Sequence, residues 1–98
     1  MSLKINDVID VKPIHDVSIN GVYLQIFHAN KGEGVAKHEH PHSHATMCHA
    51  GKILISKDGI QLSMDKTTPP ILLKSDGWHQ IEAIEDETVF VNVFAMKV

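Results

Sequence analysis

Apolar residues occur along the chain in short runs that are separated by turn signals. The runs are rich in Val, Ile and Phe and are bounded by Gly, Asn, Asp and Pro. Period-two runs of this length between turn residues predict β-strands. We expect strands over residues 22–29, 52–56, 60–64, 71–73, 78–84 and 88–96. No long stretch shows the 3.6-residue periodicity of an amphipathic helix.

The turn signals recur every 8–12 residues or so, which is typical of a β-sandwich or barrel. We therefore predict an all-β chain folded as a small antiparallel β-barrel. The 98 residues are enough for one core and form a single domain, 1–98. The barrel core is expected over about 20–96, and residues 1–19 form an N-terminal strand or arm. The beginning of that arm is compatible with a short helical turn around Ile5 to Ile9.

Composition excludes several classes of function. The net charge is −3, and all nine basic residues are Lys. Because the chain has no Arg and a negative net charge, nucleic acid is a poor partner. The single cysteine, Cys48, excludes a disulfide framework and a four-thiolate zinc site. No apolar run is long enough for a membrane span, and the first residues do not resemble a signal peptide, so we expect a cytoplasmic protein without membrane partners.

Histidine is the residue type that stands out, with eight copies in the chain, four of them within residues 38–44. If residues 35–40 are a strand, His38 and His40 point to the same face, because side chains alternate with period two. Two imidazoles on one strand face form a bidentate metal site. His79 begins a much later strand, and closure of a barrel could bring it opposite this pair.

The spacing of these residues resembles the first motif of the cupin superfamily. The matching positions are Gly32, His38, His40, His44 and Gly51. His44 stands where that motif has a glutamate. Residues 74–79 resemble a degraded second motif, in which Gly77 lies one residue too close to His79 and the proline is missing.

The resemblance implies a double-stranded β-helix of the jelly-roll type with one divalent transition metal per chain. Carried over by position, the ligands are His38, His40, His44 and His79. Imidazole suits Zn, Cu, Fe and Ni, and the candidate ions for this site are Zn, Ni, Fe and Mn. Two alternatives stay open: a solvated His-rich loop that binds metal weakly, and a barrel that has lost its metal.

The alternation of side chains along the strands also predicts which of the remaining residues face into the barrel and which face outward. Counted from His44, Cys48 should face inward, whereas Met47 and His49 should face outward. Surplus apolar residues at outward positions predict a homodimer, as the resemblance also does. Three residues are candidate polar or titratable groups of a substrate pocket: Tyr23, Gln25 and Asn92. His42 is expected at the mouth of the barrel.

Two hypotheses about function remain. The first is a metal-dependent enzyme, an oxygenase, isomerase or lyase acting on a small oxygen-rich or carboxylate substrate. The second is a non-catalytic module that binds metal or a small ligand. Four neutral ligands would leave the ion its full charge and favour anionic ligands. The catalytic residues are not identifiable from the sequence.

Overall fold

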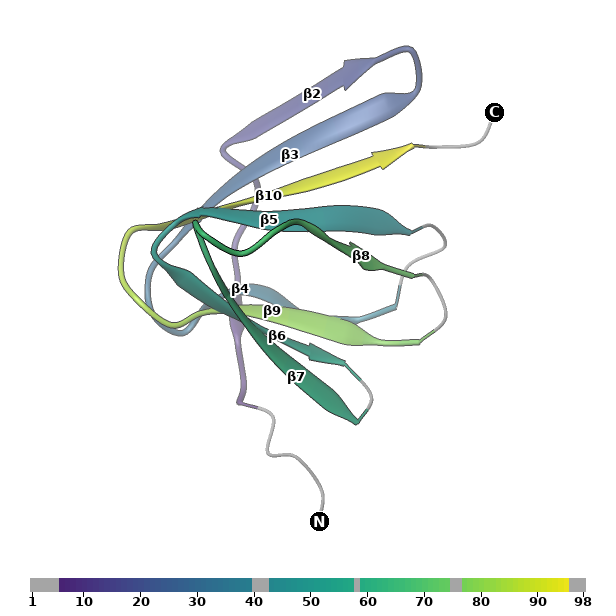
Figure 1. The fold of residues 1–98 in the computed structure, drawn as a ribbon. Coiled ribbons are helices and arrows are strands. Elements are labelled where there is room, and N and C mark those ends of the chain that lie inside the picture. Colours follow the sequence, from purple (N-terminus) through teal and green to yellow (C-terminus); the bar gives the residue numbers. More distant parts are fainter. Residues whose placement is uncertain (1–5, 40–42, 58, 75–76, 96–98) are drawn as a thin grey trace.

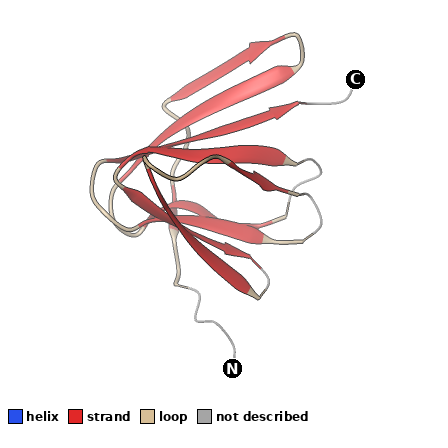
Figure 2. Ribbon diagram, in the orientation of Figure 1, coloured by secondary structure: helices blue, strands red, loops and turns tan. Residues whose placement is uncertain are grey.

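The computed structural model describes residues 6–39, 43–57, 59–74 and 77–95. Within these ranges the chain forms ten strands and no helix (Figures 1 and 2). The strands are β1 Ile9–Asp10, β2 His15–Ile19, β3 Val22–Ala29, β4 Glu33–His38, β5 His44–Ala50, β6 Lys52–Lys57, β7 Ile60–Asp65, β8 Ile71–Leu73, β9 His79–Ala83 and β10 Thr88–Ala95. None of the described elements is a helix long and apolar enough to span a membrane.

The strands build two five-stranded sheets that face each other. One sheet has the order β1-β4-β9-β6-β7, and the other has the order β2-β3-β10-β5-β8. The chain crosses between the sheets at most connections, and only the β2–β3 and β6–β7 hairpins stay within one sheet. This arrangement confirms the predicted all-β fold. One short pair departs from the antiparallel expectation, because β1 runs parallel to β4.

The N-terminal segment differs from its prediction. The structure places two short strands there, β1 in one sheet and β2 in the other, with β1 starting where a helical turn was expected; Ile5 lies outside the described residues. The Val11 amide donates to Gly34 and the Ile14 amide to Ile26, so the chain changes sheets between these residues. Pro13 lies at the change. Because proline has no N–H to donate to a ladder, it suits a position between two strands.

The core lies between the sheets and is made of inward-facing residues from both. The Phe27 and Phe90 rings stack with their centroids 4.8 Å apart on neighbouring strands. The other buried apolar residues are Ala29, Cys48, Ile53, Ile55, Met64, Leu73, Ile81 and Ala83. Every second residue of a strand contributes, as alternation requires for two packed sheets.

Gly34 marks a close approach between β4 and β9. A Cβ atom at this position would collide with the carbonyl oxygen of Ile81 and lie 3.3 Å from the Cα of Glu82. Backbone atoms cannot move aside as a flexible side chain can. Only glycine therefore allows β4 to pair with β9, and this pairing places His38 opposite His79.

We expect Gly34→Ala to lower the free energy of unfolding by about 3 kcal/mol, because the added methyl group overpacks the β4–β9 backbone contact. The matched control is Gly59→Ala, whose Cβ would meet nothing within 4 Å and whose φ is +77°. That variant carries only the cost of a left-handed conformation, about 1 kcal/mol. Urea unfolding of both variants measures the difference. If both variants lost the same free energy of unfolding, the contact between β4 and β9 would leave room for a Cβ atom at position 34.

Candidate functional site

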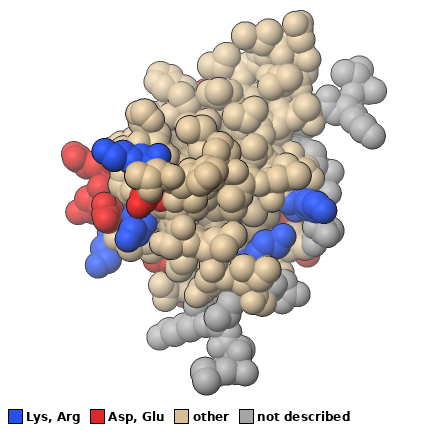
Figure 3. Space-filling view, in the orientation of Figure 1, with Lys and Arg blue, Asp and Glu red and all other residues tan. Residues whose placement is uncertain are grey.

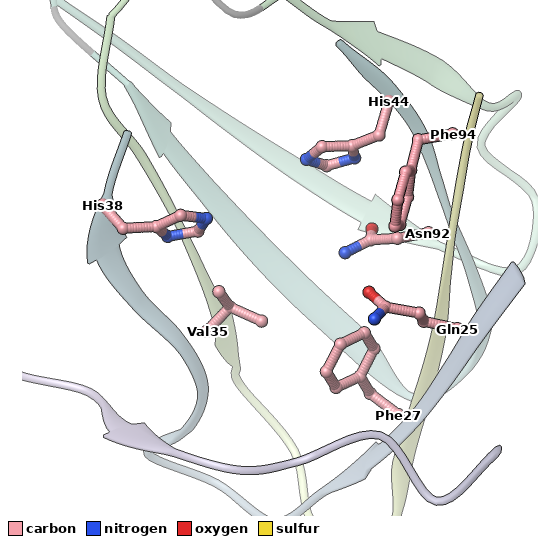
Figure 4. Close-up of a pocket in the computed structure, with 7 residues that line it drawn as sticks. All are labelled: Gln25, Phe27, Val35, His38, His44, Asn92 and Phe94. Atoms are coloured by element: carbon pink, nitrogen blue, oxygen red, sulfur yellow. The ribbon is translucent and has the colours of Figure 1, made fainter. Parts of the chain in front are cut away.

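A cavity of about 250 Å³ lies between the two sheets, beside His38 at the end of β4. Figure 4 shows the side chains that line it, which come from both sheets. They are Gln25, Phe27, Val35, His38, His44, Asn92 and Phe94. No Asp, Glu or Lys side chain belongs to this described lining, so two phenyl rings, two amides and two imidazoles set its chemistry.

An irregularity in β4 turns His38 toward the cavity. Val35 and His38 both line it although they are three residues apart, which a regular alternating strand would not allow. The register between β4 and β9 shifts between these two residues. A bulge of this kind redirects a side chain, and here it brings His38 opposite His79.

Three imidazoles converge from three strands. His79 begins β9 and is 2% exposed, and its ring packs edge-on against His38, with centroids 4.8 Å apart. His44 begins β5 and is 6% exposed. Its Nε2 lies 3.1 Å from Nε2 of His79. The structure thus brings together three of the four histidines that the sequence predicted as one group.

A hydrogen-bonded chain holds the His44 ring from behind. The Thr46 hydroxyl donates to Oδ1 of Asn92 at 2.7 Å and lies 2.9 Å from Nδ1 of His44. A hydroxyl has one proton to give. Because that proton goes to Asn92, Nδ1 of His44 must be the donor to Thr46. The neutral ring therefore carries its proton on Nδ1, and its unprotonated Nε2 accepts from Nε2 of His79.

A hydrogen bond at Nδ1 also fixes the ring of His38. Its Nδ1 lies 2.7 Å from the carbonyl oxygen of Ala36, which can only accept. Nδ1 of His38 is therefore protonated, and in the neutral ring Nε2 carries the lone pair. Both rings are thus fixed by hydrogen bonds at Nδ1, which leaves Nε2 of each as the nitrogen able to bind an electrophile.

The remaining predicted residues have different positions. His40 and His42 lie outside the described residues. Gln25 and Asn92 line the cavity, and they are direct neighbours across β3 and β10. Tyr23 is not among the described lining residues; its ring stacks on Phe94, which does line the cavity, with centroids 5.2 Å apart.

Thr46 is the site residue whose role sequence reasoning missed. It shares the inner face of β5 with His44, two residues away, and alternation alone could have placed it there. Its hydrogen bond to Asn92 could not be foreseen, because that contact joins β5 to a strand forty-six residues further along the chain.

The other predictions for β5 are confirmed. Cys48 is buried, whereas Met47 and His49 are exposed. Burial raises the pKa of the Cys48 thiol, although a backbone hydrogen bond of Ala50 acts in the opposite direction. A buried thiol with a raised pKa is a poor nucleophile, so Cys48 serves as a small core residue.

Comparison with known proteins identifies the architecture. No protein-family model and no curated protein matches the chain. Solved structures do. A Klebsiella pneumoniae protein described as having a double-stranded β-helix domain is 26% identical, with a TM-score of 0.68 over 86% of this chain and 76% of that one. The chain has the cupin fold.

Two further structures share the cupin fold at lower identity. A cupin protein from Bacteroides fragilis is 20% identical, with a TM-score of 0.69 over 97% of this chain and 82% of its own. KdgF from Halomonas is 12% identical, with a TM-score of 0.73 over 84% and 76%. Identities this low show the fold and leave the activity undecided.

Metal ligation must be judged from the described donors. Among the residues that the structure describes, no group of three or more His, Cys, Asp or Glu is arranged to hold a metal ion. His40, the fourth histidine of the predicted set, lies outside the described residues. The described residues therefore supply a close pair, His44 and His79, with His38 beside it.

We expect Thr46→Val to lower the free energy of unfolding by about 2 kcal/mol, since it removes the donor to buried Asn92 and the acceptor for Nδ1 of His44. In nitrogen-15 NMR spectra of the metal-free protein, the wild-type His44 ring should be the Nδ1–H tautomer. The valine variant should lose that preference, whereas Thr46→Ser should keep it. A wild-type His44 protonated on Nε2 would contradict the hydrogen-bonded chain.

Proposed function

We propose that this cupin-fold chain binds one divalent transition metal ion at the histidine end of the cavity, with His38, His40, His44 and His79 as ligands. The observation that carries the proposal is the pair of Nε2 atoms of His44 and His79, 3.1 Å apart in a buried site. Without metal this contact is a hydrogen bond between the two rings, and an ion that binds both nitrogens would replace the shared proton.

The separation fits two ligands of one ion. Metal–imidazole bonds are about 2.0–2.1 Å long, so two nitrogens at a right angle around one ion lie about 2.9 Å apart, and at a tetrahedral angle about 3.4 Å. The observed 3.1 Å lies between these values. Little rearrangement of the two rings would be needed for both to reach one ion.

The hydrogen bonds at Nδ1 of His38 and His44 also support metal binding. Ligating histidines typically donate their second ring N–H to a carbonyl, carboxylate or other acceptor, which fixes the tautomer and the orientation of the ring. His38 does so toward Ala36, and His44 does so toward Thr46. Both rings are therefore held as the rings of ligating histidines are.

The donor set indicates the class of metal. Imidazole nitrogen suits Zn, Cu, Fe and Ni, whereas Mg, Ca and Mn prefer oxygen ligands. A bound ion of this class would act as a Lewis acid toward an oxygen atom of a ligand in the cavity. With neutral protein ligands it would keep its full charge and so favour anionic or oxygen-rich molecules.

The cavity wall would orient such a molecule. Oδ1 of Asn92 accepts from Thr46, which leaves its Nδ2 as a donor toward the cavity (Figure 4). The Nε2 of Gln25 contacts Asp16 at 3.5 Å, so its Oε1 is the acceptor nearest the cavity. A donor and an acceptor side by side, flanked by Phe27 and Phe94, suit a small molecule with hydroxyl or carbonyl groups.

Catalysis by an oxygenase, isomerase or lyase is an extension of this proposal. It requires a group that moves a proton, and the titratable groups of the described lining are His38 and His44, which the proposal uses as ligands. This observation favours the second candidate function, a non-catalytic metal- and ligand-binding module. Turnover of small hydroxy or keto acids by the metal-loaded protein would establish the enzyme instead.

The metal site is tested by elemental analysis of protein purified at pH 7.5. The wild type should hold about one divalent transition metal per chain. His79→Ala should lose most of it, because that change removes the ligand from β9. His42→Ala should retain it, since His42 is expected at the mouth. His44→Glu should retain binding with a shift toward harder metals such as Mn or Fe(II).

The contrary result is equally specific. If His42→Ala loses metal while His79→Ala keeps it, the metal is held by the local His-rich loop, and the cavity site is wrong. Wild-type protein without metal, even after incubation with Zn, Ni, Fe(II) or Mn, would also refute the site.

Acid should release the metal. Imidazole must be neutral to bind a metal ion, and histidine side chains generally take up a proton near pH 6. The metal content of dialysed wild-type protein should therefore be constant at neutral pH and fall as the pH drops toward and below about 6. Metal retained at pH 4 would indicate ligands other than histidine.

A further inference from the structure

The bulge in β4 lies directly before His38. Val35 and His38 are three residues apart, whereas the residues of β9 opposite them are two apart, so Ala36 and Lys37 together oppose Gln80. An extra residue of this kind disrupts the ladder locally and bends its strand. The backbone of these two residues therefore decides the direction in which the His38 side chain leaves β4.

Two side chains accept hydrogen bonds from the amides of the bulge. The Ala36 amide donates to Oδ1 of Asp10 at 2.7 Å, and the Lys37 amide donates to Oε1 of Gln80 at 3.2 Å. Asp10 ends β1 and Gln80 lies on β9, the two strands that flank β4 in the sheet. A carboxylate acceptor makes the stronger, charge-assisted bond. The bulge is thus held from both sides.

Ala36 connects the carboxylate of Asp10 to the imidazole of His38. Its amide donates to Asp10, and its carbonyl oxygen lies 2.7 Å from Nδ1 of His38. The position of the Ala36 backbone therefore determines where Nδ1 finds its acceptor and, because the ring is rigid, which way Nε2 points. Figure 4 shows the result, with Val35 and His38 both extending from β4 toward the cavity that they line.

Residues 6–11 keep both acceptors in place. This segment is bound along β4, since the amides of Ile9 and Val11 donate to backbone carbonyls at the beginning of that strand. The carbonyl oxygen of Asn6 accepts from Nε2 of Gln80 at 3.0 Å, which leaves Oε1 of the same amide for the bulge. Gln80 is 3% exposed, so its side chain is packed in this orientation.

We propose that Asp10, together with Gln80, is a positioning residue that orients His38 for metal binding by holding the bulge of β4. The proposal rests on the metal site proposed above. Asp10 is exposed and does not belong to the described cavity lining, so it acts through Ala36 and not as a ligand. Loss of a partner that orients a ligating histidine typically weakens metal binding by about 10–100-fold. Because Asp10 acts one residue further from the ring, we expect the lower end of this range.

The test is a titration with Zn²⁺ against a competing chelator at pH 7.5. Asp10→Ala removes the acceptor of the Ala36 amide and should raise the Zn²⁺ dissociation constant about 10-fold. Asp10→Asn keeps an oxygen acceptor in the same place without the negative charge, and its dissociation constant should stay within about 3-fold of the wild type. Rescue by asparagine separates the hydrogen bond from a long-range attraction between the carboxylate and the metal ion.

The matched control is Asp86→Ala. Asp86 is exposed like Asp10, and its Oδ1 accepts from the backbone amide of Lys31 at 3.0 Å. That bond lies before the first residue of β4, whereas His38 is the last residue of the strand. In Figure 3 the charged side chains gather at the left, where Figure 1 shows the β3–β4 and β9–β10 turns. The control removes one charge and one comparable bond there and should leave Zn²⁺ binding unchanged.

A second measurement does not depend on metal. In nitrogen-15 NMR spectra of the metal-free protein, the His38 ring should be the Nδ1–H tautomer in the wild type and in Asp10→Asn, because Nδ1 donates to Ala36. Asp10→Ala should lose that preference. Far-UV circular dichroism checks that each variant keeps its β-structure. If Asp10→Ala does not fold, Gln80→Met, which removes the other acceptor of the bulge, decides by the same two measurements.

Two results would overturn the positioning role. The first is Asp10→Ala with the Zn²⁺ affinity and the His38 tautomer of the wild type. The second is an equal loss of affinity in Asp86→Ala or in Asp10→Asn, which would mean that stability or charge is responsible. Failure of the metal site itself looks different, because the wild type then binds no Zn²⁺. In that case a lost tautomer preference in Asp10→Ala still supports Asp10 as the residue that orients His38, and an unchanged tautomer refutes it.

Discussion

The fixed register between β3, β10 and β5 is the constraint on which the rest of the structure depends. Once these strands are paired, every residue on them is assigned to the inner or the outer face of one sheet. On β5 the inner residues are His44, Thr46 and Cys48, which build the cavity and the core. The residues between them lie, with the alternate residues of β10 and β3, on the outer face of the sheet. A slip of one residue would exchange the two surfaces.

Buried polar groups impose the second requirement. His44, Thr46 and Asn92 lie in the layer between the sheets, where an unpaired polar atom is costly. Their mutual hydrogen bonds satisfy them and also fix the tautomer of His44. The same bonds therefore stabilise the sheet and orient the ring that we propose as a ligand. On the other sheet, Gly34 permits the strand contact that places His38 opposite His79. The cavity is thus built from constraints that the fold must meet in any case.

Much of the fold and part of the site could be predicted from the sequence, and each success rests on local information. Period-two runs and turn residues located β3, β6, β7, β8, β9 and β10 to within a residue or two. Alternation from His44 placed Cys48 inward and Met47 outward. The failures were non-local. The sequence did not reveal that Pro13 divides the N-terminal segment between two sheets, that β1 runs parallel to β4, or that Thr46 bonds to Asn92.

The sequence by itself determined which side chains share a strand face and which residue types are present. Alternation has a fixed period, and the spacing of the histidines is written in the chain. Only the tertiary structure decided which faces meet. The Nε2 atoms of His44 and His79 come within 3.1 Å because two strands of different sheets close over one cavity. The outer face of the sheet β2-β3-β10-β5-β8 is continuous because its five strands, which are separated along the chain, lie side by side. Such contacts depend on strand order and register, which local sequence patterns do not encode.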